Sequence, residues 1–123
     1  MRWILTAGAA GGFLTVALGA FGAHVLEAHL TPDRMETFRT ATFYLGLHAL
    51  ALLLVGVLAR DGRPGWQWPA RLFTAGLLLF SGSLYLLALS GIRWLGAVTP
   101  FGGLAFLAGW VLLAMTAWRH PGR

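Results

Sequence analysis

The sequence has 123 residues, of which 58% are hydrophobic and 11% are charged. Soluble domains usually have about 25% charged residues, so the composition argues against an ordinary soluble domain. The formal net charge of +5 would fit a nucleic-acid-binding protein, but the basic residues are all arginines that flank apolar runs and form no single patch, which excludes that class. The absence of cysteine excludes disulfides and thiolate chemistry.

Four runs without Asp, Glu, Lys or Arg make up most of the chain. They cover residues 3–26, 40–59, 72–92 and 94–118. A helix needs about 20 mostly apolar residues to cross the hydrocarbon core of a bilayer. Helix is expected in lipid because its backbone groups bond within their own segment, and the alternation that a β-barrel requires is absent.

The chain is therefore predicted to be an all-α integral membrane bundle, with one transmembrane domain over residues 1–123. The four transmembrane helices are expected at about 3–25, 40–59, 69–90 and 99–118.

The first predicted helix is rich in small residues, and Gly8 and Gly12 form a GxxxG pair. Small residues allow close approach of helix backbones in lipid, where the hydrophobic effect does not drive association. This pattern predicts that Gly8 and Gly12 pack against another helix and that the first helix is central in the bundle.

Thr31 and Pro32 form a helix-start signal before the second apolar run, with threonine as the N-cap and proline in the first turn. We expect a helix to begin there and to continue into the second span. The segment ARDGRPGWQWP, residues 59–69, is a turn by composition, and its final proline is expected to open the third helix.

The third predicted helix contains the uncharged stretch LFSGSLYLLALSG, residues 79–91. Ser81 and Ser83 are two residues apart and so point to different sides of a helix, whereas Ser81 and Tyr85 are four apart and share a face. Serine can return its hydroxyl to the carbonyl one turn back, and Gly82 leaves room for a neighbouring backbone. Helix packing is therefore favoured over catalysis here, with Tyr85 kept as a candidate site residue.

Thr99 and Pro100 repeat the cap-plus-proline signal and predict the start of the fourth helix. Within this helix, Gly102 and Gly109 lie on one face with Ala105 and predict a second close-packing stripe.

Arginines in loops predict that both termini are cytoplasmic, because the cytoplasmic side of a membrane protein has the excess of positive charge. Three arginines would then lie outside: Arg34, Arg39 and Arg93. Six would lie inside: Arg2, Arg60, Arg63, Arg71, Arg119 and Arg123.

Polar residues of several helices fall in the outer half of the bilayer under this topology. The candidate polar site consists of His24, Glu27, His48, Ser81, Tyr85 and Thr99. Ionisable groups in a membrane are costly and mark a candidate site by default. His48 has three open interpretations: a satisfied packing histidine, a proton-relay or ligand-binding group, and a metal ligand with His24 and Glu27.

The stretches GAFGAH (19–24), YLGLHALALL (44–53), LFSGSLYLLALSG (79–91) and LGAVTPFGGLAFLAGW (95–110) resemble the YgdD/YwdK-like family of small bacterial inner-membrane proteins. The resemblance covers nearly the whole chain and implies four membrane helices in the bacterial plasma membrane. It implies no activity, substrate or catalytic residue.

Two functions follow as hypotheses. The first is a non-enzymatic membrane protein that acts through helix, lipid or partner interaction, with a homo-oligomer as one form. The alternative is transport or sensing of a small molecule, ion or proton at the polar site. No motif for a cofactor is present, so none is expected. Membrane lipids are the expected partners, and the sequence does not define a small-molecule ligand or a metal.

Overall fold

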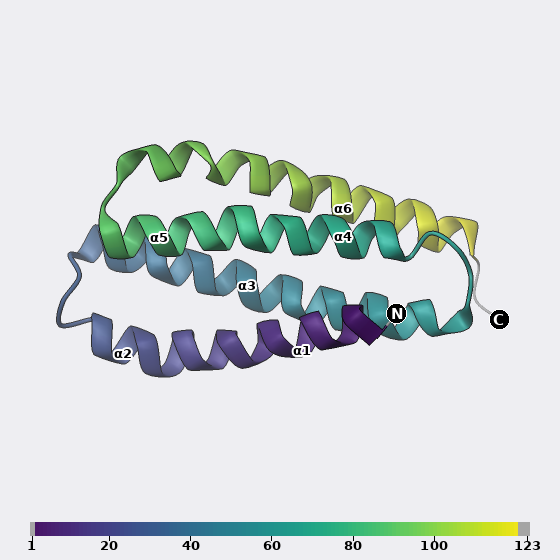
Figure 1. Ribbon diagram of the computed structural model, residues 1–123, viewed down its shortest axis with the longest axis horizontal. Helices are drawn as coiled ribbons and strands as arrows, with labels where there is room; N and C mark the ends of the chain where they lie inside the picture. Colours follow the sequence, from purple (N-terminus) through teal and green to yellow (C-terminus); the bar gives the residue numbers. More distant parts are fainter. Residues whose placement is uncertain (1, 121–123) are drawn as a thin grey trace.

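A computed structural model describes residues 2–120 of the chain. Arg123, which was counted above for the orientation, lies outside the described residues. Every regular element in the described range is helical, and the elements join into four long rods (Figure 1). All four rods are long and apolar enough to cross a membrane. The predicted all-α bundle of four transmembrane helices is therefore confirmed.

The four rods are named spans 1 to 4 and run alternately up and down the bundle (Figure 1). Span 1 consists of α1 (Arg2–Val16), the π-helix η1 (Ala17–Gly22) and α2 (Ala23–Leu26). Span 2 consists of α3 (Pro32–Leu58) and the 3-10 turn η2 (Ala59–Asp61). Span 3 consists of α4 (Gln67–Gly76), the π-helix η3 (Leu77–Ser81) and α5 (Gly82–Ser90). Span 4 consists of the 3-10 turn η4 (Arg93–Ala97) and α6 (Thr99–Arg119).

The chain enters and leaves the bundle at one end (Figure 1). We call the end that holds Arg2 and Arg119 the termini end, and the end that holds the connections 27–31 and 91–92 the far end. At the far end, Gly91 ends α5 in the left-handed conformation with φ of 73°, which glycine adopts without the steric cost of a Cβ.

The second helix begins at Pro32, about eight residues before the uncharged run that predicted its position. Thr31 is extended, and its hydroxyl oxygen accepts a hydrogen bond from the backbone N–H of Arg34 at 3.3 Å. The predicted threonine cap is thus present, and charged residues occupy the first turns of α3 because these turns precede the apolar part of the span.

The predicted cap at Thr99 is wrong. Val98 stands at the N-cap position of α6, and Thr99 is already helical. The Thr99 hydroxyl forms a hydrogen bond with the Ser83 hydroxyl of span 3 instead, with 2.6 Å between the two oxygens. A tertiary contact has therefore replaced the local cap.

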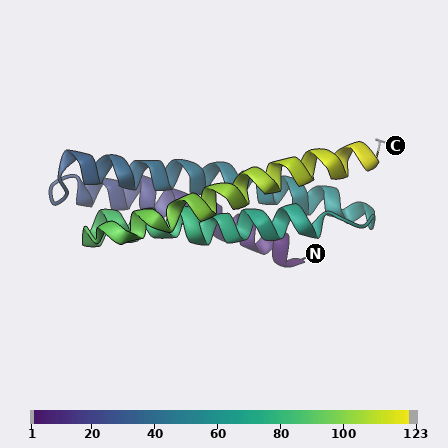
Figure 2. The same ribbon diagram turned by 90° about the horizontal axis from the view of Figure 1, so that it is seen from above.

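The central helix is α3, not the first helix as the small-residue pattern predicted. It contacts α1 on one side and α4, η3 and α5 on the other, while α6 packs mainly against α4 and η3. Ten residues of α3 are buried, compared with three in α1. Figure 2 shows α6 crossing the bundle obliquely.

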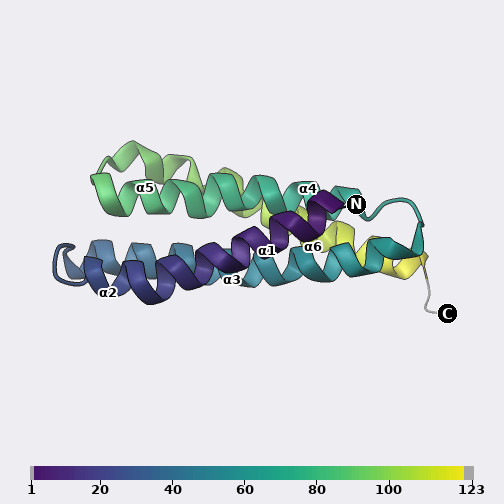
Figure 3. The same ribbon diagram turned by 60° about the horizontal axis from the view of Figure 1, so that its bottom comes forward.

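Span 1 follows α3 and separates from span 3 toward the far end (Figure 3). Its packed face consists of Ile4, Gly8 and Gly11, which are buried. A Cβ at Gly8 would lie 2.9 Å from Leu53 Cγ. A Cβ at Gly12 would meet nothing within 4 Å. Gly12 contacts no other helix of the bundle, because the face that meets α3 continues from Gly8 to Gly11. The packing of Gly12 against another helix stays a prediction.

The fourth helix uses both of its predicted glycines. A Cβ at Gly102 would lie 2.3 Å from the backbone nitrogen of Phe80, and one at Gly109 would lie 2.7 Å from the Phe73 ring. Gly82 of the third span differs, since its nearest neighbour would be Leu77 O at 3.9 Å. The predicted backbone approach at Gly82 is therefore wrong.

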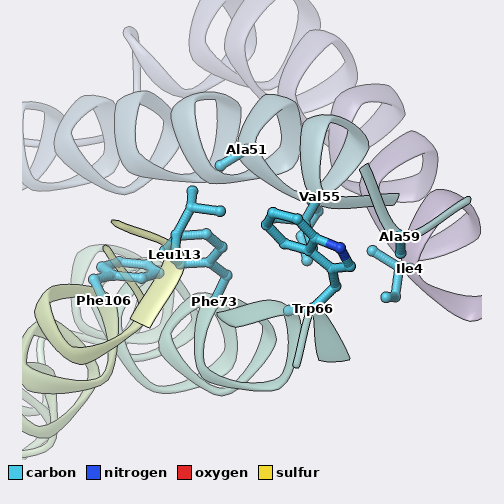
Figure 4. Close-up of a cluster of buried hydrophobic side chains, with 10 residues drawn as sticks. Ile4, Ala51, Val55, Ala59, Trp66, Phe73, Phe106 and Leu113 are labelled. Atoms are coloured by element: carbon cyan, nitrogen blue, oxygen red, sulfur yellow. The ribbon is translucent and has the colours of Figure 1, made fainter. Parts of the chain in front are cut away.

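The core lies toward the termini end, where spans 2, 3 and 4 converge. Figure 4 shows Trp66, Phe73 and Phe106 pointing into the space beside Ala51 and Val55 of α3. A smaller cluster at the far end joins Met35, Phe38 and Ala88. Both clusters are built on α3, which explains why this helix is the most buried.

Candidate functional site

A buried histidine lies near the middle of the bundle, where α3 faces α6. His48 is 2% exposed. Its ring stacks on that of Phe106, with centroids 3.6 Å apart and planes 8° from parallel. Trp110 Nε1 donates a hydrogen bond to His48 Nε2 at 3.0 Å, and His48 Nδ1 lies 2.9 Å from the carbonyl oxygen of Tyr44. Both nitrogens of the imidazole therefore have partners.

These two partners fix the protonation state of His48. An indole nitrogen only donates hydrogen bonds, so His48 Nε2 must accept and carries no proton. Nδ1 then carries the proton and donates it to the Tyr44 carbonyl. A proton relay through this ring would require the bond from Trp110 to break. The geometry thus favours the packing interpretation of His48 over the relay interpretation.

An aromatic groove opens on the side of the bundle beside His48, between α3 and α6. Its volume is about 530 Å³. The rings of Tyr44, Phe80, Phe106 and Trp110 line it together with His48. Pro100, Gly103 and three leucines complete the lining: Leu47, Leu104 and Leu107. We refer to this feature as the aromatic groove.

The aromatic rings are held by contacts with each other. The Tyr44 ring lies 4.7 Å from that of Phe80, and Phe80 lies 5.4 Å from Phe106. Trp110 contacts both Phe73 and His48. Offset and edge contacts of this kind add stability beyond the area that they bury, so the walls of the groove are preformed.

The predicted hydroxyl groups of span 3 lie in separate pairs. Ser81 donates to the carbonyl oxygen of Ala41 at 3.0 Å, which is a bond across to α3 and not the expected return to its own helix. Tyr85 is bonded to Thr42, also on α3, at 2.7 Å. Ser81 and Tyr85 therefore face the same helix, as their spacing of four residues predicts.

Ser83 points the other way, toward span 4. It donates to the Phe80 carbonyl oxygen at 3.0 Å and is bonded to Thr99. Since the one Ser83 hydroxyl proton goes to the carbonyl, Thr99 is the donor in the pair. This pair fastens the start of α6 to span 3.

The two remaining candidates, His24 and Glu27, are exposed at the far end of span 1. No hydrogen bond within residues 2–120 joins any two of the six candidate residues. In the same range, no three His, Asp or Glu side chains are grouped so that they could hold a metal ion. The three-ligand set of His24, Glu27 and His48 is thus not assembled, because His48 is turned into the core.

Comparison with known proteins gives one family. Residues 18–103 match the family described as "Protein of unknown function (DUF423)". The chain belongs to this family.

Two relatives that match nearly the whole chain are named as membrane proteins. The UPF0382 inner membrane protein YgdD of Escherichia coli K12 is 44% identical over 96% of this chain and 91% of its own length. The UPF0382 membrane protein SH2409 of Staphylococcus haemolyticus is 40% identical over 99% of this chain and all of its own length. No solved structure matches. Together with the four apolar spans, these names place this DUF423 protein in the bacterial plasma membrane as a multi-pass protein.

Sequence reasoning missed the aromatic wall of the site in this DUF423 protein. Phe106 and Trp110 lie one turn apart on α6 and both contact His48. A signal was present, because Trp110 is a tryptophan in the middle of a span, whereas tryptophans usually lie at the membrane interface. An indole N–H at that depth needs an acceptor, and His48 supplies it.

A second, smaller groove lies between span 1 and span 3. Its volume is about 300 Å³, and Ala7, Ala10 and Gly11 form one wall. The opposite wall includes Gly82, Ser81 and Tyr85. The hydroxyls of Ser81 and Tyr85 already have partners on α3. Two of the predicted site residues thus border this groove and not the aromatic one.

Proposed function

We propose that this protein is a non-enzymatic binding protein of the membrane, which holds the apolar part of a lipophilic molecule in the aromatic groove. One observation carries the proposal: a groove of about 530 Å³ with aromatic walls opens beside His48, near the middle of the bundle. Binding sites for small molecules typically have volumes of about 300–1,000 Å³ and are lined mainly by apolar and aromatic side chains.

The hydrogen bonding around the groove supports binding without chemistry. His48 uses both ring nitrogens, and Trp110 uses its indole N–H. Among residues 2–120, no fully buried side-chain nitrogen or oxygen lacks a hydrogen-bond partner; Tyr44, which is only partly buried, is not in this group. A general base or a nucleophile needs a free position toward its substrate, and His48 offers none.

Transport or sensing at a polar site has less support. Three of the six candidate residues lie in the separate pairs His48–Trp110, Tyr85–Thr42 and Thr99–Ser83. Each pair closes its own hydrogen bonds, so the pairs do not combine into one polar path. A cation or proton would have to break these bonds in sequence.

The proposed function is tested by measuring how many lipophilic molecules stay bound to the protein. A leucine at Gly103 would project into the aromatic groove, and its Cβ would meet the Phe80 ring at 3.8 Å, an ordinary contact. Purified protein is examined by native mass spectrometry after exchange into defined lipid. We expect Gly103→Leu to retain fewer lipophilic molecules than the natural protein.

The matched control is Ala9→Leu, on an exposed position of α1 that lines neither groove. This variant should retain the natural number of bound molecules. Equal retention by the natural protein and Gly103→Leu would contradict the proposed function.

We further propose that the termini end faces the cytoplasm. The arginines of this end outnumber those of the far end by six to three if Arg123 is included, and the cytoplasmic side of membrane proteins has the excess of such residues. The aromatic groove then extends from the middle of the bilayer toward the outer leaflet, because Pro100 lies at the far end of α6 and Trp110 near its middle.

A homo-oligomer through span 1 is a second candidate, supported by one observation. Gly12 lies on α1 with nothing near its would-be Cβ, so this face can receive another helix closely. Crosslinking through Gly12→Cys in native membranes should give a dimer. Monomer alone would contradict this second proposal.

A further inference from the structure

Tyr44 has a hydroxyl group without a partner in the wall of the aromatic groove. Its ring is fixed by Phe43, at 5.3 Å, and by Phe80, at 4.7 Å. Within residues 2–120 its hydroxyl makes no hydrogen bond, although the backbone carbonyl of the same residue accepts one from His48. The other tyrosine, Tyr85, bonds to Thr42.

The depth of Tyr44 limits what can satisfy this hydroxyl. The uncharged run of this span begins at residue 40, so Tyr44 lies four positions, or about 6 Å at 1.5 Å per residue, inside its far-end boundary. Water is scarce within the hydrocarbon core, and a hydroxyl there without an acceptor is costly.

The acceptor must therefore belong to a molecule that enters the hydrocarbon core. Long-chain hydrocarbons enter it and have no acceptor. A phospholipid ester group at the far-end boundary has an acceptor near this depth, and so has a lipophilic compound with a ring carbonyl. The walls of the groove distinguish the two.

The walls of the groove favour a planar ring over a flexible chain. Five rings line the groove, including the stacked pair of His48 and Phe106. Flat aromatic faces gain offset-stacking energy with a planar partner. The volume of about 530 Å³ is sufficient for a bicyclic ring with the first part of a tail.

We infer that the aromatic groove binds a lipophilic planar carbonyl compound, of the chemical class of prenylated quinones, with the Tyr44 hydroxyl donating a hydrogen bond to a ring carbonyl oxygen. This inference rests on the proposed function and names its ligand class. It assigns Tyr44 the role of selecting the ligand by its acceptor, and Trp110 and Phe80 the role of contacting the ring.

A pair of matched probes tests the inference. The first is 2-methyl-1,4-naphthoquinone with one prenyl group at position 3, and the second is the naphthalene of the same shape without the carbonyls. Binding is measured in nanodiscs by extraction and chromatography, with empty nanodiscs as the blank. We expect the natural protein to bind the quinone about tenfold more tightly than the hydrocarbon, the ratio for one hydrogen bond of about 1.4 kcal/mol.

Two variants test whether the ratio of the two affinities depends on the Tyr44 hydroxyl or on the loss of any tyrosine hydroxyl. Tyr44→Phe should bring the ratio close to one, while Tyr85→Phe should leave it near tenfold because its hydroxyl bonds to Thr42. An unchanged ratio in Tyr44→Phe would overturn the inference. Methyl oleate serves as an ester on a flexible chain, and binding of this ester with the same dependence on Tyr44 would overturn the assignment to a ring.

A second measurement uses the natural protein alone. The infrared carbonyl stretch of the bound quinone should shift to lower frequency than in empty nanodiscs, and an unshifted band would overturn the inference even if Tyr44→Phe did not fold. The proposed function fails separately: if Gly103→Leu binds both probes as well as the natural protein does, the groove is not the site. If both probes bind in the groove with equal affinity, only the ligand class is wrong.

Discussion

The Trp110 indole donates its hydrogen bond to His48 Nε2 at 3.0 Å, and this bond joins α6 to α3 near the middle of the bundle. Each residue supplies the hydrogen-bond partner that the other needs. A buried imidazole needs an acceptor for its proton and a donor for its lone pair, and an indole N–H in lipid needs an acceptor. The pair thus allows two polar side chains in a span where isolated ones would be unfavourable.

The His48–Trp110 bond predicts a coupling between the two positions. His48→Phe keeps a ring over Phe106 but leaves the indole N–H without an acceptor, so it should lower the free energy of unfolding by about 1–2 kcal/mol. The double variant with Trp110→Phe should lose less than the sum of the single variants. Unfolding in mixed detergent and sodium dodecyl sulfate measures all three, and strictly additive losses would contradict the bond.

The close approach of α6 to span 3 predicts different effects of alanine at two glycines. Gly102→Ala should lower the free energy of unfolding by about 2 kcal/mol, because the added methyl group meets the Phe80 backbone. Gly12→Ala should be neutral or stabilising by roughly 0.5 kcal/mol, since its methyl group meets nothing and alanine is the better helix former. The same unfolding assay compares them, and equal losses would show that Gly102 is not at a tight contact.

The hydrogen bond from Arg34 to the end of α5 predicts that its loss increases local opening at the far end. Its Nε donates to the carbonyl oxygen of Ala88 at 2.7 Å, and its guanidinium lies beside Gly91, where α5 ends. A cation at a helix C-terminus engages carbonyl groups that lack partners in the helix. Arg34→Gln should therefore speed amide hydrogen exchange in residues 89–97 about tenfold, which corresponds to about 1.4 kcal/mol.

The control for this prediction is Arg39→Gln, an exposed arginine on the same helix. It should leave exchange in this segment unchanged. If both substitutions had the same effect, loss of charge and not the bond to Ala88 would be the cause.

The proposed orientation predicts labelling from one side. The chain has no cysteine, so single cysteines can be introduced at two exposed positions, Ala28 at the far end and Pro64 at the termini end. A membrane-impermeant maleimide added to intact spheroplasts should label Ala28→Cys and should label Pro64→Cys after lysis only. The reverse pattern would invert the topology and leave the fold unaffected.

The order of residues along the chain is enough to predict the membrane environment and the number of spans. Uncharged runs of 20 residues or more force helices in lipid, and this requirement depends on the local chain alone. The Thr31 cap was predictable for the same reason, since a cap joins residues that are neighbours in sequence. The spacing of Ser81 and Tyr85 likewise predicted that both face one helix.

The partners of those residues depend on how the four spans pack against each other. The four-residue spacing of Gly8 and Gly12 fitted a packing face, but the path of α1 along α3 made Gly11 the contact residue. Thr99 fitted a cap and bonds to Ser83 instead. Neither His48 nor Trp110 specifies the other, because 62 positions separate them and only the packing of α6 brings the indole N–H to the imidazole. Spacing along a helix fixes which side a residue faces, whereas the neighbour on that side depends on how all four spans pack.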